Sequence, residues 1–355
     1  MQTLRLAVDP EHLDTAEACA ALDRAAEILR SGGLVALPTE TVYGLGANAL
    51  DPAAVARIFT AKQRPSWDPV IVHIAGPVDA NPMLAQIVTD IPGSADKLTA
   101  AFWPGPLTLL LPRSAAVPDA VTAGRLLVGV RMPAHPVALQ LIRRAGVPIA
   151  APSANMFSRT SPTTAAHVLE DLDGRIDAIL DSGPTTHGVE STVLDPGQSP
   201  MMIYRPGAVT QEQIRSVAGP VEIYRKDGPA PSESLQALPS PGVGMRHYAP
   251  RARLVLIEAP LSDLPAQLAR TAALYSKERI GMMLPADMAA AGGPETAVFP
   301  WGRWAAPEEM AHSLYAGLRA LDGLGCTVIL CPMPPGEGIG DAIRDRLRKA
   351  ARGHA

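Results

Sequence analysis

Cysteine and aromatic side chains are scarce in this 355-residue chain, and no apolar run approaches the length needed to span a membrane. The three cysteines, Cys19, Cys326 and Cys331, form neither a paired disulfide framework nor a CxxC-type zinc motif. The start of the chain lacks a basic-then-apolar signal pattern. We therefore expect reduced thiols and a soluble, cytoplasmic protein that does not act at a membrane.

Strong positive charge is also missing. The formal net charge is −4 and the isoelectric point is about 6.1, so any nucleic-acid contact has to be local. With only 4% aromatic residues, the chain offers few platforms for base stacking. We expect no stable direct binding of nucleic acid. Hydrophobic residues make up 47% of the sequence, which is enough for the cores of two domains.

Strand and helix patterns alternate through the first 210 residues, which predicts an α/β unit. A helical stripe covers residues 15–30, and further helices are expected over 94–102 and 136–145 and after Asp51, Ser161 and Thr210. Ser161 reads as the N-cap of its helix, and Thr210 with Gln213 as a capping box. The intervening apolar runs predict buried strands.

The pattern changes after residue 210. Residues 211–251 contain the irregular stretch DGPAPSESLQALPSPGVG and are predicted to be a linker. Residues 252–350 again alternate strand and helix, which predicts a small Rossmann-like α/β/α domain. The glycine-rich run at 336–340 is weak as a phosphate motif and reads as a turn that enters the last helix. No hydrolase triad, Walker loop or zinc motif occurs in the sequence.

The first candidate site is the segment PTETVYGLG, which follows the apolar run at 34–37. Thr39, Glu40 and Thr41 crowd together there, and Gly44 and Gly46 would let backbone amides approach a ligand. A plain hydroxyl-rich turn, with glycines at positive φ and Thr39 as a helix cap, is an equally good interpretation of these residues alone.

Charged side chains mark further candidate positions. Lys62 and Arg64 follow a predicted helix and can either complement its dipole or grip a polyphosphate. His73 lies on a predicted strand, where histidine is usually structural. Arg131 ends an apolar strand and needs either a carboxylate ligand or an internal acid as its partner.

Two later loops repeat this mixture of hydroxyl and polar groups. The first, PSANMFSRTSPTT, holds Ser153, Asn155 and Ser161 just after a predicted buried strand. The second, HGVEST, is followed by a strand, and Arg205 stands at the end of the next one. Hydroxyls, amides and separated cations suit the binding of a nucleoside triphosphate together with a small polar substrate.

Taken together, these motifs resemble a known family. The segments PTETVYGLGANA, KQRPxxxPVIVHI, FWPGPLTLLL, VRMPAHPVA, APSAN, GVESTVLD and RPGAVT, in this order, are similar to the YrdC-like domain of threonylcarbamoyl-AMP synthases. SPGVGMRHYAP and the C-terminal region resemble the long, two-domain form. The resemblance implies an α/β fold with an N-terminal YrdC-like twisted mixed open sheet with helices (1–210), a linker that is a candidate lid (211–251), and a smaller Rossmann-like domain (252–350).

The resemblance also implies a reaction and a set of partners. L-threonine, bicarbonate and ATP, the last with Mg²⁺, would give threonylcarbamoyl-AMP and pyrophosphate, and a threonylcarbamoyl-transferase complex would then act on tRNA. No side chain is expected to ligate a metal. Lys62 and Arg64 would be catalytic. The threonine pocket would contain Thr39, His73, Arg131 and Ser191, and the nucleotide site would contain Lys62, Arg64, Thr122, Ser153, Asn155, Ser161, Arg205 and Tyr248.

One segment departs from the family pattern, and two other functions remain open. The basic and aromatic pair expected before RHYAP is replaced by Val243, Gly244 and Met245, which leaves the linker's ligand contacts open. An RNA-binding or ribosome-associated module with the same fold is the main alternative. A carbamoyl-adenylate domain of the hydrogenase-maturation type is another, although the cysteine clusters of that type are absent from the sequence.

Overall fold

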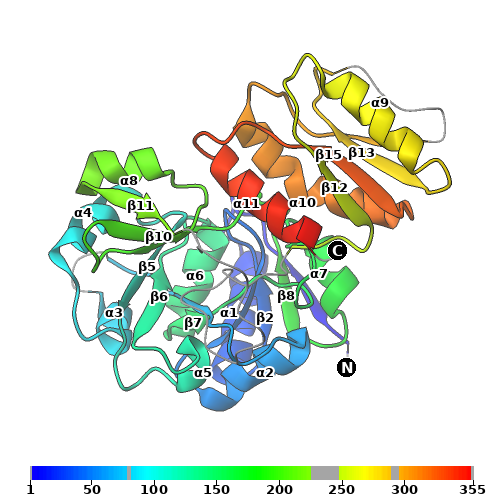
Figure 1. Cartoon of the computed structure of the whole chain (residues 1–355). Helices are drawn as coiled ribbons and strands as arrows, with labels where there is room; N and C mark the ends of the chain where they lie inside the picture. Colours follow the sequence, from blue (N-terminus) through cyan, green and yellow to red (C-terminus); the bar gives the residue numbers. More distant parts are fainter. Residues whose placement is uncertain (1, 78–80, 225–247, 289–295, 353–355) are drawn as a thin grey trace.

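The computed structural model describes residues 2–77, 81–224, 248–288 and 296–352. Within these ranges the chain forms two bodies, each built on its own sheet (Figure 1). The larger body contains the N-terminal residues, and the smaller one contains residues 253–351. No helix in the described part of the chain is long and apolar enough to cross a bilayer.

The larger sheet is mixed and has the strand order β1-β8-β2-β3-β7-β4-β6-β5-β9-β10-β11. Its strands are β1 (Leu4–Ala7), β2 (Val35–Leu37), β3 (Gly44–Asn48), β4 (Ile71–His73), β5 (Leu107–Pro112), β6 (Leu127–Arg131), β7 (Ile149–Ala150), β8 (Ala178–Asp181), β9 (Thr192–Asp195), β10 (Met201–Arg205) and β11 (Val221–Ile223). β4 runs parallel to β6, whereas β7 runs antiparallel to β4. The predicted open mixed sheet is confirmed.

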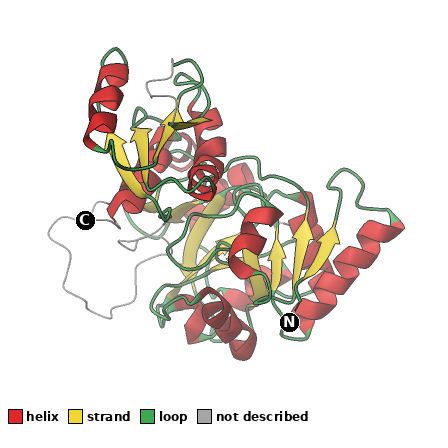
Figure 2. Cartoon of the chain, turned by 90° about the vertical axis from the view of Figure 1, so that its right-hand side faces the viewer, coloured by secondary structure: helices red, strands yellow, loops and turns green. Residues whose placement is uncertain are grey.

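Helices cover both faces of this sheet (Figures 1 and 2). They are α1 (Ala16–Arg30), α2 (Pro52–Lys62), α3 (Pro82–Ile87), α4 (Gly93–Phe102), α5 (Asp119–Thr122), α6 (Pro136–Ala145), α7 (Ala165–Leu172) and α8 (Gln211–Ala218). Successive residues of β2 point to opposite faces, as in any strand: Val35 packs with α1 and α6, and Ala36 packs with α2. The sheet is therefore buried on both sides at its centre.

The predicted loop after β2 contains a strand. Residues Gly44–Asn48 form β3, antiparallel to β2, and neither Gly44 nor Gly46 has a positive φ. A Cβ atom at Gly46 would lie 2.9 Å from side-chain atoms of Ile149 and Leu37. The alternative of a turn with glycines at positive φ is therefore wrong for Gly44 and Gly46, and at Gly46 a glycine is needed because neighbouring strands approach closely.

The smaller sheet is entirely parallel, in the order β12-β15-β13-β14. Its elements are β12 (Arg253–Ile257), α9 (Leu264–Leu274), β13 (Ile280–Leu284), β14 (Ala297–Pro300), α10 (Pro307–Gly323), β15 (Val328–Pro332) and α11 (Gly340–Ala351). α9 covers one face, and α10 and α11 cover the other (Figure 1). This three-layer α/β/α arrangement agrees with the sequence prediction.

The junction between the two bodies differs from the predicted linker at its start. Residues 211–223 form α8 and β11, and β11 pairs with β10, so this segment extends the larger sheet. Residues 225–247, which hold most of SPGVGMRHYAP, lie outside the described residues. α10 and α11 face the larger body, where Val42 and Val189 join their hydrophobic core.

Candidate functional site

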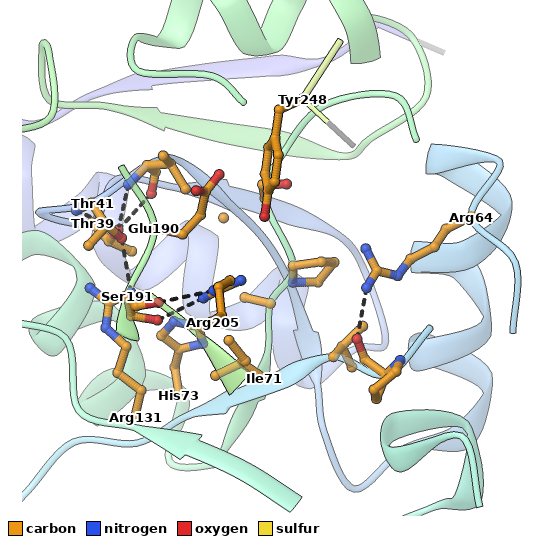
Figure 3. A pocket seen from close by; sticks show the side chains of 17 residues that line it. Thr39, Thr41, Arg64, Ile71, His73, Arg131, Glu190, Ser191, Arg205 and Tyr248 are labelled. Atoms are coloured by element: carbon orange, nitrogen blue, oxygen red, sulfur yellow. Dashed lines mark hydrogen bonds between the residues drawn. The ribbon is translucent and has the colours of Figure 1, made fainter. Parts of the chain in front are cut away.

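One pocket collects residues from many separate elements of the larger sheet (Figure 3). β4, β6 and β10 contribute to it, as do the loops after β2 and β7, the loop before β9, the exit of α2 and the segment that precedes the second body. It encloses about 560 Å³ of space, part of it open to solvent. Its lining is Thr39, Thr41, Val42, Gly44, Arg64, Pro69, Val70, Ile71, His73, Arg131, Ala151, Pro152, Ser153, Glu190, Ser191, Arg205 and Tyr248.

A network of hydroxyls and one ion pair forms one end of the pocket. The Thr39 and Thr41 hydroxyls lie 2.9 Å apart, and Thr39 donates to the carbonyl of Val42 at 2.6 Å. Arg131 donates to the Thr41 hydroxyl at 2.9 Å and pairs with the Glu40 carboxylate at 2.6 Å. Burial favours the neutral form of Glu40, but Arg131 more than offsets this and lowers the pKa of that carboxyl. Arg131 thus has the internal acid that the sequence left as one of two options.

His73 lies beside this network. It pairs in register with Arg131 across the parallel strands β4 and β6, and its ring is almost fully buried. Burial, together with the positive charge of Arg131, lowers the pKa of His73 to about 3. Its Nδ1 atom has no hydrogen-bond partner among the described residues. His73 is therefore a neutral ring beside the pocket, with its Nδ1 atom buried and unpaired within the described part of the chain.

Ser191 and Arg205 form the floor of the pocket (Figure 3). The Ser191 hydroxyl lies 2.8 Å from the Thr108 hydroxyl and accepts a hydrogen bond from Arg205 Nη2 at 3.0 Å. Arg205 Nε also donates to the Ser191 carbonyl at 3.0 Å. Both side chains are buried, so this arginine presents a fixed positive charge to the pocket.

The two predicted catalytic cations differ in their placement. Arg64 lines the pocket at the end opposite to Thr39, where it pairs with Asp68 at 2.9 Å and donates to the carbonyl of Pro69 at 2.7 Å. The Lys62 amine is buried and donates to the carbonyls of Ser153, at 2.5 Å, and Asn155. Burial and the nearby charge of Arg64 lower the pKa of Lys62 well below its ordinary value. Lys62 is not among the residues that line the pocket.

The other residues predicted to bind the nucleotide also differ in whether they line the pocket. Ser153 lines the pocket, whereas Asn155 lies behind it and donates to the carbonyls of Met156 and Arg159. Thr122 is not among the residues that line the pocket, and it accepts a hydrogen bond from Arg113 at 3.3 Å.

The prediction that Ser161 is the N-cap of a helix is wrong. α7 begins at Ala165, and its N-cap is Thr164, which accepts from the backbone of His167. Ser161 instead donates to the Glu190 carboxylate at 2.6 Å and is fully buried. The N-cap prediction was wrong because three hydroxyl residues follow one another closely here, and the sequence does not show which of them precedes the helix.

Tyr248 is the first described residue after the gap at 225–247, and it reaches the pocket (Figure 3). Its backbone has a φ of 68°, in the left-handed region, and its ring is buried. Burial raises the pKa of Tyr248 to about 12, so it stays a neutral phenol. Val243, Gly244 and Met245, whose departure from the family pattern was noted, lie outside the described residues, and the lid remains a prediction.

Glu190 is a pocket residue to which the sequence interpretation gave no role. It is buried, and its carboxylate contacts two side chains of the second body: Tyr315 donates to it at 3.0 Å and Arg346 at 2.7 Å. Burial would raise the pKa of Glu190, but Arg346 and Arg205 lower it to about 2. The acid in the HGVEST segment was the only available signal, because its partners lie more than a hundred residues away in the sequence.

Fold and pocket together define a class: a two-domain α/β protein with a cationic, hydroxyl-rich pocket on a mixed sheet, in which side chains of the second domain contact residues that line the pocket. A family model described as "Telomere recombination" (Sua5_yciO_yrdC) matches residues 27–207. A second model, "Threonylcarbamoyl-AMP synthase, C-terminal domain", matches residues 209–352.

Individual relatives agree over nearly the whole chain. A threonylcarbamoyl-AMP synthase of Pyrococcus abyssi is 43% identical over 330 residues, covering 92% of this chain and 93% of the relative. One of Bacillus subtilis is 43% identical, covering 93% and 92%. The crystal structure of P. abyssi Sua5 complexed with L-threonine matches with a TM-score of 0.88 and 40% identity over 98% of both chains. The chain therefore belongs to the threonylcarbamoyl-AMP synthase family and is an enzyme of this type.

Proposed function

We propose that this protein condenses L-threonine, bicarbonate and ATP into threonylcarbamoyl-AMP and pyrophosphate. The proposal rests on where the predicted site residues lie in the fold. All four residues predicted to bind threonine, Thr39, His73, Arg131 and Ser191, line a single pocket together with the predicted nucleotide residues Arg64, Ser153, Arg205 and Tyr248. The names of the relatives and the L-threonine complex of the P. abyssi protein support the same reaction.

The reaction needs two bond-forming steps. The threonine amine first adds to the carbon of bicarbonate, and loss of water gives a carbamate. A carbamate oxygen then attacks the α-phosphorus of ATP, the bond from that phosphorus to the β-bridging oxygen breaks, and pyrophosphate leaves with the bonding electrons. Neither step requires a covalent enzyme intermediate, so positioning and charge neutralisation are the main demands on the protein.

The end of the pocket around Arg131 suits the amino acid. An arginine has five N–H donors, and Arg131 uses three of its N–H groups on Gly105, Thr41 and Glu40. Two donors are left for a carboxylate. The side-chain hydroxyls of Thr39 and Thr41 offer neutral polar contacts for the rest of the substrate, and a neutral His73 does not repel the ammonium group of L-threonine.

The end of the pocket at Arg64, together with Arg205 on the floor, suits the triphosphate, because negative charge increases on the leaving group as the α–β bond breaks. Arg64 is held by Asp68, and Arg205 by Ser191, so neither cation needs to reorganise when the reaction occurs. In this proposal Lys62 exchanges its carbonyl partners for the pyrophosphate. Anionic phosphates would favour the protonated amine that burial now disfavours.

We propose that Mg²⁺ enters with ATP and not in a protein cage. Among the described residues no cluster of three or more histidine, cysteine or acidic side chains could hold a metal ion. Glu190, the acid that lines the pocket, and the neighbouring acids Glu40 and Asp68 are all paired with arginines. Phosphate oxygens and water are the usual ligands of nucleotide-bound Mg²⁺, and the ion would reduce the charge of the triphosphate.

The product, a mixed anhydride, is a threonylcarbamoyl donor. We propose that a separate threonylcarbamoyl-transferase complex consumes it to modify tRNA and that the protein acts in the cytoplasm.

The test of the proposed reaction is pyrophosphate release from ATP by the purified chain, with L-threonine and bicarbonate added or omitted one at a time. Release that requires both substrates is expected. Release independent of threonine, or none with Mg²⁺ present and the protein folded, would favour the alternative of an RNA-binding module.

A further inference from the structure

Two side chains of the second body, Tyr315 on α10 and Arg346 on α11, each contact the same two pocket residues. Tyr315 donates to both oxygens of Glu190 at 3.0 Å, and its ring stacks on Tyr248 with a centroid separation of 5.8 Å. Arg346 Nε donates to Glu190 at 2.7 Å, and its guanidinium carbon lies 5.2 Å from the centre of the Tyr248 ring. Both side chains are buried, so these contacts are shielded from water.

Glu190 is the first of the two pocket residues that Tyr315 and Arg346 contact. Ser161, Tyr315 and Arg346 all donate to its carboxylate, which leaves it unsuited to accept a proton as a general base. What it can do is fix the backbone of the next residue, Ser191, whose hydroxyl and carbonyl both hold Arg205. The second body is thereby coupled to the serine and the arginine on the pocket floor.

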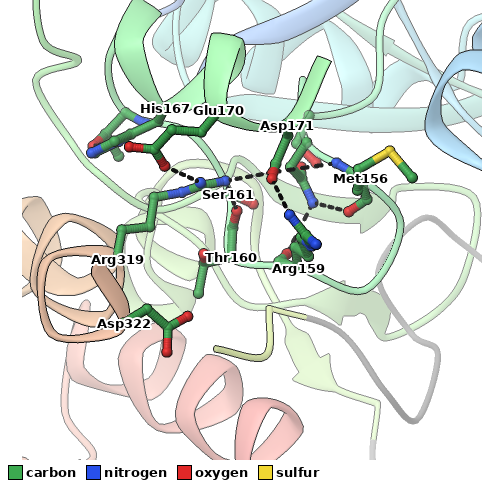
Figure 4. A network of polar contacts seen from close by, with 12 residues as sticks. Met156, Arg159, Thr160, Ser161, His167, Glu170, Asp171, Arg319 and Asp322 are labelled. Atoms are coloured by element: carbon green, nitrogen blue, oxygen red, sulfur yellow. Dashed lines mark hydrogen bonds and ion pairs between the residues drawn. The ribbon is translucent and has the colours of Figure 1, made fainter. Parts of the chain in front are cut away.

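The same face of α10 docks on the larger body at further points (Figure 4). Arg319, one turn after Tyr315, pairs with Asp171 at 2.8 Å and donates to the Thr160 carbonyl at 2.6 Å. A Cβ atom on Gly188 would lie 2.5 Å from the backbone of α10, so the segment before Glu190 runs directly against the helix. These contacts fix the position of α10 relative to the pocket.

We infer that Tyr315 and Arg346 are positioning residues of the active pocket, through which the second domain sets the orientation of Glu190 with Ser191 on one side and of Tyr248 on the other. The inference rests on the proposed function, in which Ser191 faces threonine and Tyr248 faces the nucleotide. It assigns the second domain a part in substrate binding. Neither side chain needs to touch a substrate.

The decisive variant is Arg346→Gln, with Arg348→Gln on the same helix as its matched control. Arg348 is half exposed, and its ion pair within the described part of the chain is a 3.4 Å contact with Glu258. We expect Arg346→Gln to reduce kcat/KM at least about tenfold, mainly by raising KM for ATP and for threonine. Arg348→Gln should match wild type. Arg346→Lys, which keeps the charge, should recover part of the loss, and Tyr315→Phe, which keeps the ring but not the hydroxyl, should show a smaller rise in KM.

A pH profile separates positioning from mere support of the fold. The groups around Glu190 that set its ionisation are Ser161, Arg205, Tyr248, Tyr315 and Arg346, with Asp345 next to the last. Without Arg346 the pKa of Glu190 rises, because burial is then opposed mainly by Arg205. The kcat/KM of Arg346→Gln should therefore fall on the acid side at a higher pH than that of wild type. A purely structural role would lower the active fraction, and so kcat, at unchanged KM and with an unchanged profile.

The outcomes are distinguishable. If wild type and Arg348→Gln show no threonine-dependent pyrophosphate release, the proposed function fails. If both are active and folded Arg346→Gln and Tyr315→Phe keep the wild-type KM values and pH profile, the positioning role is rejected and the proposed function stands. Circular dichroism and a thermal melt of each variant establish folding. Should Arg346→Gln fail to fold, Arg346→Lys and Tyr315→Phe decide by the same criteria.

Discussion

The buried pair between Arg131 and Glu40 allows a quantitative test of how the pocket is held together. The two side chains are 4% and 7% exposed, and the charged atoms lie 2.6 Å apart. Arg131→Gln would leave the Glu40 carboxylate buried without its cation. Removing one partner of a buried pair typically costs about 3–5 kcal/mol, because the remaining charge stays desolvated. We expect Arg131→Gln to lower the free energy of unfolding by an amount in this range.

The double variant Glu40→Gln/Arg131→Gln separates the pair from its surroundings. With both charges gone, two neutral amides replace the ions, and most of the lost stability should return. The coupling energy from the four-protein cycle is therefore expected to be about 2 kcal/mol or more in favour of the pair, within the range measured for residues in contact.

Urea unfolding followed by circular dichroism gives the free energies, and Arg143→Gln, at an exposed position in the last turn of α6, serves as the control. The control should change stability by less than about 1 kcal/mol, the size of a helix-dipole contact. If Arg131→Gln behaved like Arg143→Gln, or the cycle were additive, the buried pair would not be what fixes this end of the pocket.

Three further outcomes are expected. Lys62→Ala should lower the rate of pyrophosphate release at least about tenfold, through loss of the cation that we propose binds the leaving group; near-wild-type turnover would remove Lys62 from the mechanism. In a urea titration, Gly188→Ala should lower the free energy of unfolding by roughly 2 kcal/mol more than Gly146→Ala does. Both glycines have a φ near 70°, but of the two only Gly188 has backbone atoms of α10 2.5 Å from an added Cβ. Equal effects would contradict this close docking. Because the pKa of His73 is about 3 in the folded chain and about 6.5 for an unperturbed histidine in the unfolded chain, the free energy of unfolding should fall as pH drops below 6.5, by about 1.4 kcal/mol per pH unit for this one proton. His73→Asn should flatten the measured slope by that amount, and an unchanged slope would refute the assignment.

Much of the secondary structure follows from local signals. The helix predicted at 15–30 is observed at Ala16–Arg30, because Thr15 caps it and its apolar residues repeat on one face. The capping box of Thr210 and Gln213 is present as expected. β11 was missed because it is three residues long, and nothing in so short a segment shows that it pairs with β10.

The site was harder to predict from the sequence than the fold. The loop residues could be grouped because hydroxyl-rich segments follow buried strands, and the family resemblance named the members. It could not show that Lys62 turns towards two carbonyls while Arg64 lines the pocket. Two cations separated by one residue at the end of a helix carry the same local signal, and only the packing of the loop after β7 distinguishes them.

Arg346 illustrates the limit most clearly. Its helix, α11, carries Asp345, Arg348 and Lys349, so the sequence reads as a charged surface helix whose basic residues face water. In the fold Arg346 is 1% exposed and bonded to an acid 156 residues earlier in the chain. A buried arginine must find a buried acceptor, and Glu190 must find a cation, yet neither requirement specifies the other residue. The pairing is decided by how the two sheets dock, and for that reason the contact between the second domain and the pocket residue Glu190 emerges only once both bodies are seen together.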